Sequence, residues 1–431
     1  MFKLLLWIGG MTETHKDFMV ISKGNWSNDY ASMFGGISMP KSISIQVTER
    51  CNLRCTYCYF YKRRGKDITY AILDKIISMV YTNPFFSDTP SFIFDFIGGE
   101  PLLVSDKLQY FIENYYKEGL KRNVKNIQKL YSTRFSMSSN GVLYFSDKTR
   151  SLLKRYAHII SFGITLDGSP EMHNKCRIYP NGDGSYADVR KAVDEQLKYN
   201  KGLSSKVTFS VDNIHMLYDA IKHLISIGIK TIHANPVFEK GWKIKHAEIY
   251  YDELIKLANY ILNNDLENKV DVNLFTQNIG KPMDERENSN WCGGTGAMLG
   301  IGFDGSIYPC ARYFPTALSK YKPPVIGNVF DNKIDWACNK VTKGIDKITR
   351  KSQSSKRCWE CLVVQGCAWC SAYNYDYYGI INKRTTHICN MHRARVRANY
   401  YYWNSVYQKY NMDTEFILYP CEWVEDPEYG Y

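Results

Sequence analysis

Between about residues 43 and 275, short apolar runs alternate with segments whose apolar residues recur at helical spacing. The apolar runs predict strands at 43–50, 92–101, 135–141, 159–168, 206–212 and 231–238. The periodic segments predict helices at 72–81, 107–120, 146–157, 187–199, 214–228 and 247–263. Regular alternation of this kind predicts parallel strands joined by right-handed helical crossovers, so the expected fold class is α/β.

Six strand–helix units are fewer than the eight of a closed barrel, so we expect a partial (β/α)6 TIM-like barrel. In barrels of this type the chemistry gathers at the carboxyl ends of the strands. The residues that stand out follow the first four predicted strands in turn: Cys51, Gly98–Pro101, Asn140 and Asp167. The sequence therefore predicts one site at that edge of the barrel.

After about residue 285 the pattern changes, because helical periodicity fades while Cys, Gly, Trp and Tyr become more frequent. The second region has few apolar runs with which to build a core, so metal crosslinks are expected to stabilise it. We expect four parts: an N-terminal arm at 1–42, the barrel at 43–285, a small cysteine-rich domain at 286–395, and a C-terminal helix and tail at 396–431.

Composition narrows the class of protein. The chain has 431 residues, 45% of them hydrophobic, without low-complexity tracts. No apolar run approaches the roughly 20 residues that span a bilayer. The opening "MFKLLLWIGGM" lacks the small-residue cleavage site of a signal peptide. We therefore expect a cytoplasmic protein with no membrane association.

The formal charge is +12, from 55 Lys and Arg against 43 Asp and Glu. It indicates either a simply basic, soluble surface or attraction to an acidic partner, which would be nucleic acid or an acidic peptide. The stretch "YKRRGK" at 61–66 is too short to form a nucleic-acid-binding arm, so nucleic acid is not the expected partner.

Ten of the thirteen cysteines fall in clusters. In a large chain without a secretion signal, clustered cysteines bind metal or carry out redox chemistry. The loop "CNLRCTYCYF" supplies Cys51, Cys55 and Cys58, one thiolate fewer than a structural zinc site needs. On a four-iron cluster the same three ligands leave one iron open to a substrate or cofactor. The isolated Cys176, Cys338 and Cys421 are expected to be small buried hydrophobes.

This loop resembles that of the radical S-adenosylmethionine (SAM) enzymes, which have the same spacing and an aromatic residue, here Tyr57, before the third cysteine. The resemblance implies that the open iron chelates the amino and carboxylate groups of SAM. One electron then cleaves SAM to methionine and a 5′-deoxyadenosyl radical, which abstracts hydrogen from an unactivated C–H bond. It also implies an electron donor of the flavodoxin or ferredoxin type.

Two further motifs match the family in order. "GGEP" resembles its ammonium-binding turn, in which Gly98 and Gly99 allow close backbone approach, Glu100 supplies a carboxylate and Pro101 follows. Read by itself, "GGEP" is equally a simple tight turn. "SSNG" resembles the strand end that contacts the SAM ribose, and this implies that Ser139 and Asn140 act as hydrogen-bond donors.

The next strand end carries the same resemblance. "TLDG" resembles the Ser-Leu-Asp-Gly strand of the family, with Thr165 in place of Ser and Asp167 retained. Because Thr165 keeps a hydroxyl, the resemblance implies that it can still form the hydrogen bond to the ribose. "EMHNKCR" resembles a His-Asp-x-x-x-Arg stretch and implies that Arg177 pairs with the SAM carboxylate. The alternative for Arg177 is a surface or interdomain salt bridge.

The later cysteines resemble the seven-cysteine SPASM domain, which binds two auxiliary four-iron clusters and so implies three clusters in all. The resemblance implies that one auxiliary cluster takes Cys358, Cys361, Cys367 and Cys389, and that the other takes Cys292, Cys310 and Cys370. With three ligands the latter has an open iron, unless Cys338 is the fourth. Two residues, not the usual three, separate Cys367 from Cys370. The alternative is one or two zinc ribbons.

The resemblance implies a radical SAM/SPASM maturase of a ribosomally made precursor peptide. We expect thioether crosslinks of the sactipeptide or ranthipeptide type, because an open auxiliary iron would hold a substrate thiolate. About 40 residues precede the first strand, too few for the leader-recognition domain of some relatives. We therefore expect the leader to be bound by this short arm, by the barrel surface or by a separate leader-recognition protein.

Other activities stay open. Anaerobic sulfatase maturases, which make formylglycine, typically have an Asp after the cysteine that corresponds to Cys310, where this chain has Ala311. Carbon–carbon or carbon–oxygen crosslinking and epimerisation are further alternatives, the last with Cys176 as a hydrogen donor by position alone. A zinc-binding nucleic-acid adaptor is the alternative from another class. The sequence identifies no catalytic base.

Overall fold

The computed structural model describes residues 40–60, 64–86, 89–122, 127–200, 202–238, 241–285, 288–290, 292–332, 334 and 339–425. The predicted arm before residue 40, Cys338 and the last residues of the tail lie outside the described residues.

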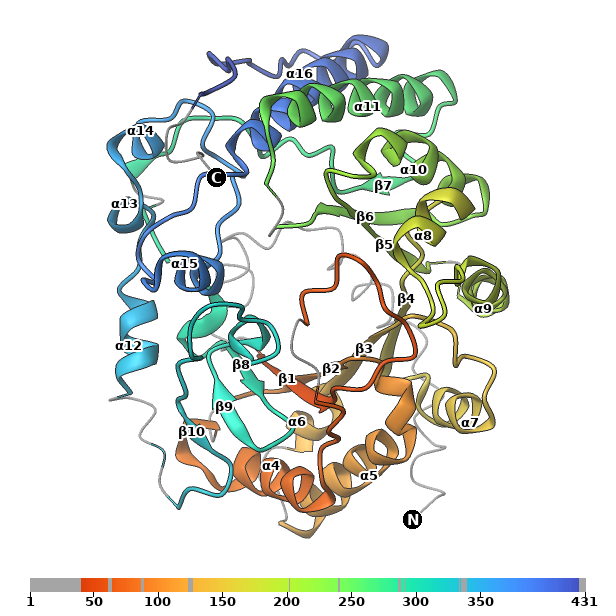
Figure 1. Ribbon diagram of the computed structural model, residues 1–431, viewed down its shortest axis with the longest axis vertical. Coiled ribbons are helices and arrows are strands. Elements are labelled where there is room, and N and C mark those ends of the chain that lie inside the picture. The colour runs from red at the N-terminus through yellow and green to blue at the C-terminus, as the bar shows by residue number, and fades with distance from the viewer. Residues whose placement is uncertain are drawn as a thin grey trace.

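Residues 41–236 contain the expected succession of parallel strands (Figure 1). One set is adjacent and parallel in a single sheet: β1 (Lys41–Thr48), β2 (Phe92–Gly98), β3 (Arg134–Ser139) and β4 (Ile160–Ile164). A second parallel sheet contains β5 (Ser204–Phe209), β6 (Thr231–Pro236) and the short β7 (Asp271–Val272). The predicted α/β partial barrel is confirmed.

Helices cover the outer side of these strands. The six predicted helices are confirmed as α4 (Tyr70–Thr82), α5 (Ser105–Lys121), α7 (Asp147–Tyr156), α9 (Tyr186–Tyr199), α10 (Leu217–Ser226) and α11 (Ile244–Asn263). Two short helices were not predicted, α6 (Ile127–Ser132) and α8 (Pro170–Cys176). Thr69, Ser146 and Ser169 cap α4, α7 and α8 by accepting backbone N–H groups, which fixes where each helix begins.

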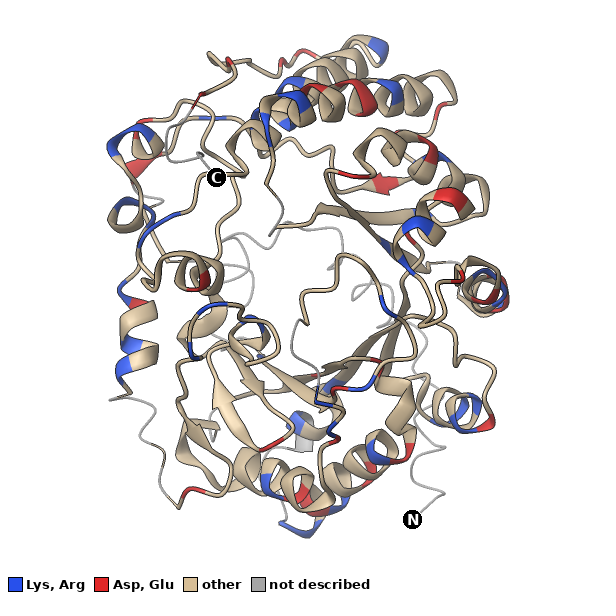
Figure 2. Ribbon diagram, in the orientation of Figure 1, with Lys and Arg blue, Asp and Glu red and all other residues tan. Residues whose placement is uncertain are grey.

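The two faces of the strands differ in polarity, because alternate side chains point to opposite sides of a sheet. Toward the helices, aromatic and aliphatic residues such as Phe94, Phe135 and Met137 are buried in one continuous core. Charged residues lie mostly on the helices and loops, and few lie on the strands (Figure 2). The inner face is instead lined by polar residues, including Ser136 and Ser138 of β3.

The cysteine-rich region extends the barrel sheet. Strand β8 (Met298–Ile301) pairs in parallel with β1, and β9 (Ser306–Tyr308) and β10 (Gly327–Asn328) continue the sheet in antiparallel fashion. The predicted domain boundaries stay predictions, but the regions on either side of residue 286 share one sheet.

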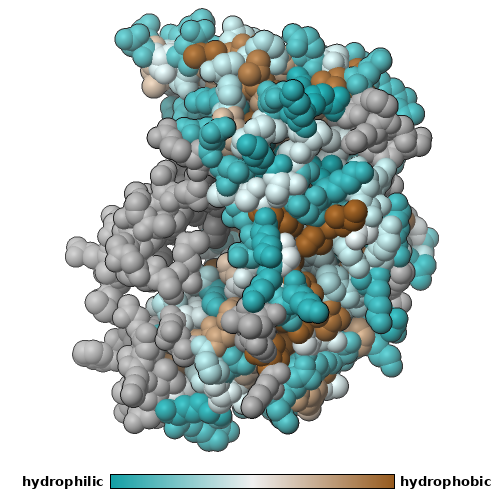
Figure 3. All heavy atoms as spheres, turned by 90° about the vertical axis from the view of Figure 1, so that its left-hand side faces the viewer, coloured by the Kyte–Doolittle hydropathy of each residue, from teal (hydrophilic) through white to brown (hydrophobic). Residues whose placement is uncertain are grey.

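Short helices follow β10: α12 (Lys340–Asp346), α13 (Arg350–Gln353), α14 (Lys356–Trp359) and α15 (Ser371–Tyr378). The face that carries them is hydrophilic over much of its area, with hydrophobic residues gathered near its middle (Figure 3). The long helix α16 (Cys389–Lys409) packs along α11 (Figure 1). In the described part of the chain, no helix is both long enough and apolar enough to cross a membrane.

Candidate active site and cysteine groups

The loop with Cys51, Cys55 and Cys58 leaves the carboxyl end of β1 and is fastened to the chain that follows α8. The Arg54 amide donates to the Ile178 carbonyl at 2.7 Å, and the Thr56 amide donates to the Cys176 carbonyl at 2.9 Å. Burial raises the pKa of Cys55 to about 11. A bound metal would be needed to hold that sulfur as a thiolate at neutral pH.

The "GGEP" turn is fitted against the start of this loop. Gly99 donates its amide to the Thr48 carbonyl at 2.9 Å, and Glu100 donates to the Arg50 carbonyl at 2.8 Å. A Cβ at Gly98 would lie 2.1 Å from the Thr48 oxygen, and one at Gly99 would lie 2.0 Å from the Arg50 oxygen. Because only glycine fits this approach, the pair is more than a simple tight turn.

Glu100 joins the end of β2 to the end of β3. Its carboxylate is buried and accepts the Leu102 amide at 3.1 Å, the Ser139 hydroxyl at 2.9 Å and the Asn140 amide at 2.8 Å. Burial raises the pKa of Glu100, and the three hydrogen bonds oppose that rise. Pro101 then starts a short 3₁₀ turn, Pro101–Val104. Glu100 therefore orders the predicted ribose-binding turn, whatever contact it makes with a ligand.

The predicted contacts of the third and fourth strands lie beside the cysteine loop. The Asn140 side-chain nitrogen lies 3.8 Å from the Cys51 sulfur and donates to the Asn52 side chain at 2.7 Å. The half-buried Thr165 donates its amide to the Ser139 carbonyl at 3.0 Å. The structure thus brings the predicted residues of β2, β3 and β4 to one edge of the barrel.

A buried group of three joins the loop to the fourth strand end. The Tyr57 hydroxyl donates to Asp167, and one terminal nitrogen of Arg177 donates to the Tyr57 oxygen at 2.8 Å and lies 3.7 Å from the Asp167 carboxylate. Asp167 has no exposed surface, and it also accepts the Thr208 amide at 2.9 Å. Arg177 is therefore neither a surface nor an interdomain ion pair. Sequence reasoning named all three residues but not their association.

This arrangement offers a test of whether SAM fits. The Nε atom of Arg177 is buried and has no hydrogen-bond partner in the part of the chain that the structure describes. The guanidinium lies close enough to Cys55 to lower the pKa of its thiol. A buried, unsatisfied cationic donor beside a three-thiol loop suits a ligand that carries a carboxylate to the open iron.

Cys292, Cys310 and Cys370 form the first C-terminal group. Burial, together with smaller effects of the neighbouring Cys370 and Cys292, raises the pKa of Cys310 to about 12. The Cys292 sulfur lies 3.2 Å from the Ser371 hydroxyl. The three side chains pack against the same apolar cluster that contains Phe60, so this group adjoins the first cysteine loop.

Cys358, Cys361, Cys367 and Cys389 form the second group, and all four line one cavity. Arg384 donates to the Cys367 sulfur at 2.8 Å. This donor suits a sulfur that carries negative charge, as a metal-bound thiolate does.

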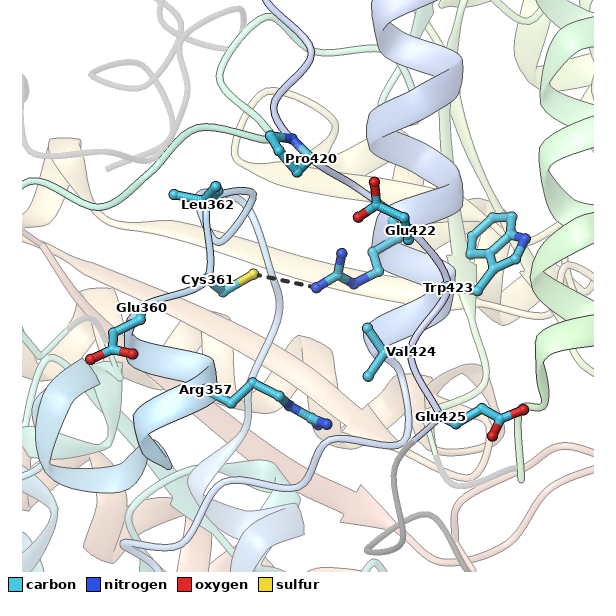
Figure 4. A pocket seen from close by; sticks show the side chains of 10 residues that line it. Arg357, Glu360, Cys361, Leu362, Pro420, Glu422, Trp423, Val424 and Glu425 are labelled. Atoms are coloured by element: carbon cyan, nitrogen blue, oxygen red, sulfur yellow. Dashed lines mark hydrogen bonds between the residues drawn. The ribbon is translucent and has the colours of Figure 1, made fainter.

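A more open pocket of about 580 Å³ lies beside the second group (Figure 4). Arg357 of α14, Arg393 of α16 and Trp423 of the C-terminal segment line it, and Arg393 donates to the Cys361 sulfur at 3.8 Å. The buried Cys421 packs in the same apolar cluster as Cys361. Cys176 is also buried. The prediction of burial is thus confirmed for two of the three isolated cysteines, and the third, Cys338, lies outside the described residues.

The spacing within the cysteine groups bears on the kind of metal. Among the described residues, no three His, Cys, Asp or Glu side chains converge closely enough to hold a single metal ion. Zinc gathers its ligands around one atom, whereas each thiolate of a four-iron cluster binds a different iron.

Three thiols follow the first strand of this partial barrel, a glycine-rich turn follows the second, and a buried Asp–Tyr–Arg group follows the fourth. This arrangement is typical of the class of enzymes that bind SAM at an iron–sulfur cluster. Residues 45–224 match the model of the Radical SAM superfamily. The chain therefore contains a radical SAM domain over these residues.

Two relatives cover most of the chain. A cysteine-type anaerobic sulfatase-maturating enzyme of Clostridium perfringens is 26% identical over 79% of this chain and 93% of its own length. The antilisterial bacteriocin subtilosin biosynthesis protein AlbA of Bacillus subtilis is 25% identical over 77% of this chain and 68% of its own.

Solved structures show the same fold. The structure titled native anSMEcpe with bound AdoMet and Kp18Cys peptide matches with a TM-score of 0.61 and 19% identity, over 87% of this chain and all of that one. Streptococcus suis SuiB bound to precursor peptide SuiA matches with a TM-score of 0.55 and 14% identity, over 84% of this chain and 82% of that one.

Proposed function

We propose that this radical SAM enzyme modifies a ribosomally made precursor peptide by joining cysteine sulfur to carbon in thioether crosslinks. The observation that carries the proposal is the position of Cys292, Cys310 and Cys370. These three thiols pack against the same apolar cluster as Cys58 and Phe60, so a substrate sulfur held at this group would lie next to the SAM site.

The relatives support a peptide substrate. One matures a sulfatase, one serves bacteriocin biosynthesis, and two of the similar structures hold peptides, by their names. The shared fold and the coverage of nearly whole chains support carrying this substrate class over. The partners that we propose are the precursor peptide, a separate leader-binding protein and an electron donor of the flavodoxin or ferredoxin type.

The residues of the first site have distinct proposed roles. Cys51, Cys55 and Cys58 would hold a four-iron cluster, which with SAM supplies hydrogen-atom abstraction from an unactivated C–H bond. Arg177 would bind the SAM carboxylate through its unsatisfied Nε atom. Asn140 and Thr165 would contact the ribose, and the hydrogen bonds of Tyr57 to Asp167 and Arg177 would fix the orientation of the guanidinium.

The two C-terminal groups would hold auxiliary clusters. The second group offers four thiols in one cavity, a complete ligand set, and the first offers three. Three ligands leave a position for the substrate thiolate, which would lose its proton on binding metal. For each thioether, the deoxyadenosyl radical would take one hydrogen atom from carbon, the thiol would lose a proton, and the remaining electron would pass to the auxiliary cluster as the C–S bond forms. The peptide would thus lose two hydrogens per crosslink.

Mass spectrometry of a co-expressed candidate peptide tests the proposal. We expect a loss of about 2 Da per crosslink, because two hydrogens leave for each new bond. Alkylation with iodoacetamide should fail at the modified cysteines, since their sulfur is no longer free. A modified peptide whose cysteines all react would contradict thioether formation, whereas carbon–carbon crosslinks would then account for the same mass change.

Formylglycine formation is the second candidate, favoured by the sulfatase-maturating relatives. The same experiment separates it, because conversion of cysteine to formylglycine removes sulfur from the peptide and creates an aldehyde. Against it stands Ala311, which starts the 3₁₀ turn Ala311–Tyr313 directly after Cys310. Alanine cannot accept a proton, so a base would have to come from elsewhere in the chain.

A further inference from the structure

The inner face of the barrel carries polar side chains that the proposed site does not use. On β5, Ser205, Val207 and Phe209 are buried on the helix side, so Lys206 and Thr208 point inward. On β3 the inward residues are Ser136 and Ser138. A barrel interior is usually filled by packed apolar side chains. This interior is not, because Lys206, Ser138 and, on β6, His233 and Asn235 are all exposed.

Lys206 is held in a defined position on that face. Its ammonium donates to the Ser138 hydroxyl at 3.1 Å, across the intervening strand β4. Gly163 of β4 is in register with Ser138, and a Cβ there would meet no atom closer than 3.9 Å. Gly163 therefore adds no side chain to the inner face beside Ser138.

Among the described residues, no carboxylate forms an ion pair with Lys206. Burial raises the pKa of Asp95 on β2, and the hydrogen bond from Ser136 and the attraction of Lys206 oppose that rise. Asp95 accepts the Ser136 hydroxyl at 2.6 Å, so its hydrogen bond goes to β3 and not to the lysine. An ammonium has three N–H donors, and one of them is used by Ser138. His233 is the register partner of Lys206 on β6, so the neighbouring strand adds a further polar side chain but no carboxylate.

Lys206 also lies close to the proposed SAM site along the barrel axis. It is two residues before Thr208, whose amide binds Asp167 of the SAM site. Two residues of a strand span about 6.6 Å, so Lys206 is one layer below the proposed cofactor contacts. A group bound by Lys206 would sit within the reach of a short peptide segment from the reacting carbon.

We propose that Lys206 binds a carboxylate of the substrate peptide, and that the enzyme selects an acidic residue near the site of modification. This inference rests on the proposed function, since it names the class of peptide that the site accepts. The net charge of +12 favours the approach of an acidic peptide over long range. At short range, Lys206 would bind one carboxylate of that peptide. Ser138 positions the lysine by accepting its hydrogen bond.

The test compares two pools of fluorescent, acetylated and amidated decapeptides that differ only in a fixed central Glu or Gln. Binding to the anaerobically reconstituted full chain with SAM is measured by anisotropy at one salt concentration. We expect about tenfold tighter binding of the Glu pool, the value of one charge-assisted hydrogen bond. The variant Lys206→Gln should bind both pools equally. Lys154→Gln, an exposed lysine of α7 on the outer side, should keep the preference.

A second readout does not depend on a variant. Acylation of Lys206 by acetic anhydride, followed by mass spectrometry, should be slowed by the Glu pool and not by the Gln pool. Equal binding of both pools by the native chain, or a Glu preference that survives in Lys206→Gln, would overturn this inference alone. Binding of neither pool would overturn the inference together with the proposed peptide substrate.

Discussion

Replacing Gly99 by alanine tests the fit between the glycine turn and the cysteine loop. The new Cβ would lie 2.0 Å from the Arg50 carbonyl oxygen and 2.5 Å from its carbon. Ordinary contacts begin near 3.4 Å, so the turn and the loop must separate by more than an ångström. That movement would break the bonds from Gly99 to Thr48 and from Glu100 to Arg50.

The size of the effect follows from these contacts. Two lost hydrogen bonds cost about 2 kcal/mol and overpacking of a rigid backbone about 1–3 kcal/mol, so we expect a loss of about 3–5 kcal/mol. Urea unfolding followed by circular dichroism measures the free energy of unfolding, and iron analysis counts the cluster after Cys51. The variant should lose that cluster, about four iron atoms per chain, and its affinity for SAM.

Gly241→Ala is the matched control, because no heavy atom lies within 4 Å of a Cβ at that position. It should keep the native unfolding midpoint and iron content. A Gly99→Ala chain as stable as the control, with full iron and SAM binding, would refute the argument that backbone contact between this turn and the loop positions the cysteines.

Three further outcomes are expected. Burial lowers the pKa of His173 to about 3, so between pH 3 and pH 6.5 the folded chain binds fewer protons than the unfolded chain. The free energy of unfolding should therefore be unaffected by His173 above pH 6.5 and fall as the pH drops toward 3, by about 2 kcal/mol at pH 5. Unfolding of the native chain and His173→Gln at pH 7 and pH 5 checks this, and an equal pH dependence of the two would argue against it. Tyr57→Phe removes the hydroxyl between Asp167 and Arg177. It should weaken SAM binding, measured by equilibrium dialysis, about tenfold and leave the iron content unchanged. An unaltered affinity for SAM would mean that Arg177 is oriented without this hydroxyl. Arg384→Met removes the hydrogen-bond donor to the Cys367 sulfur. It should lower the iron content by about four atoms per chain without loss of SAM binding. A full iron content would show that Arg384 is not needed to hold the cluster of the second cysteine group.

The barrel could be predicted from the sequence because its elements are encoded locally. Each strand is a short apolar run and each helix has its own periodicity, so the six units appear within a few residues of their predicted places. The gathering of Cys51, Glu100, Asn140 and Asp167 also followed, since the carboxyl ends of parallel strands meet at one edge.

The contacts between distant segments could not be predicted in this way. The docking of Cys176 and Ile178 on the cysteine loop uses backbone groups, which leave no mark in the side-chain pattern. The group of Tyr57, Asp167 and Arg177 spans 120 residues and depends on how α8 packs. The helices α12 to α14 are four to seven residues long, too short for periodicity to show.

The pairing of β8 with β1 has a consequence for engineering. A chimera that joined this barrel to another C-terminal region near residue 286 would lose Met298–Ile301, the strand that pairs with Ser42–Ile45 of β1. The bared edge would present unpaired backbone groups to other chains and favour their aggregation. Any exchange of specificity between such enzymes should therefore move the crossover point beyond β8, so that the donor barrel keeps its own neighbouring strand.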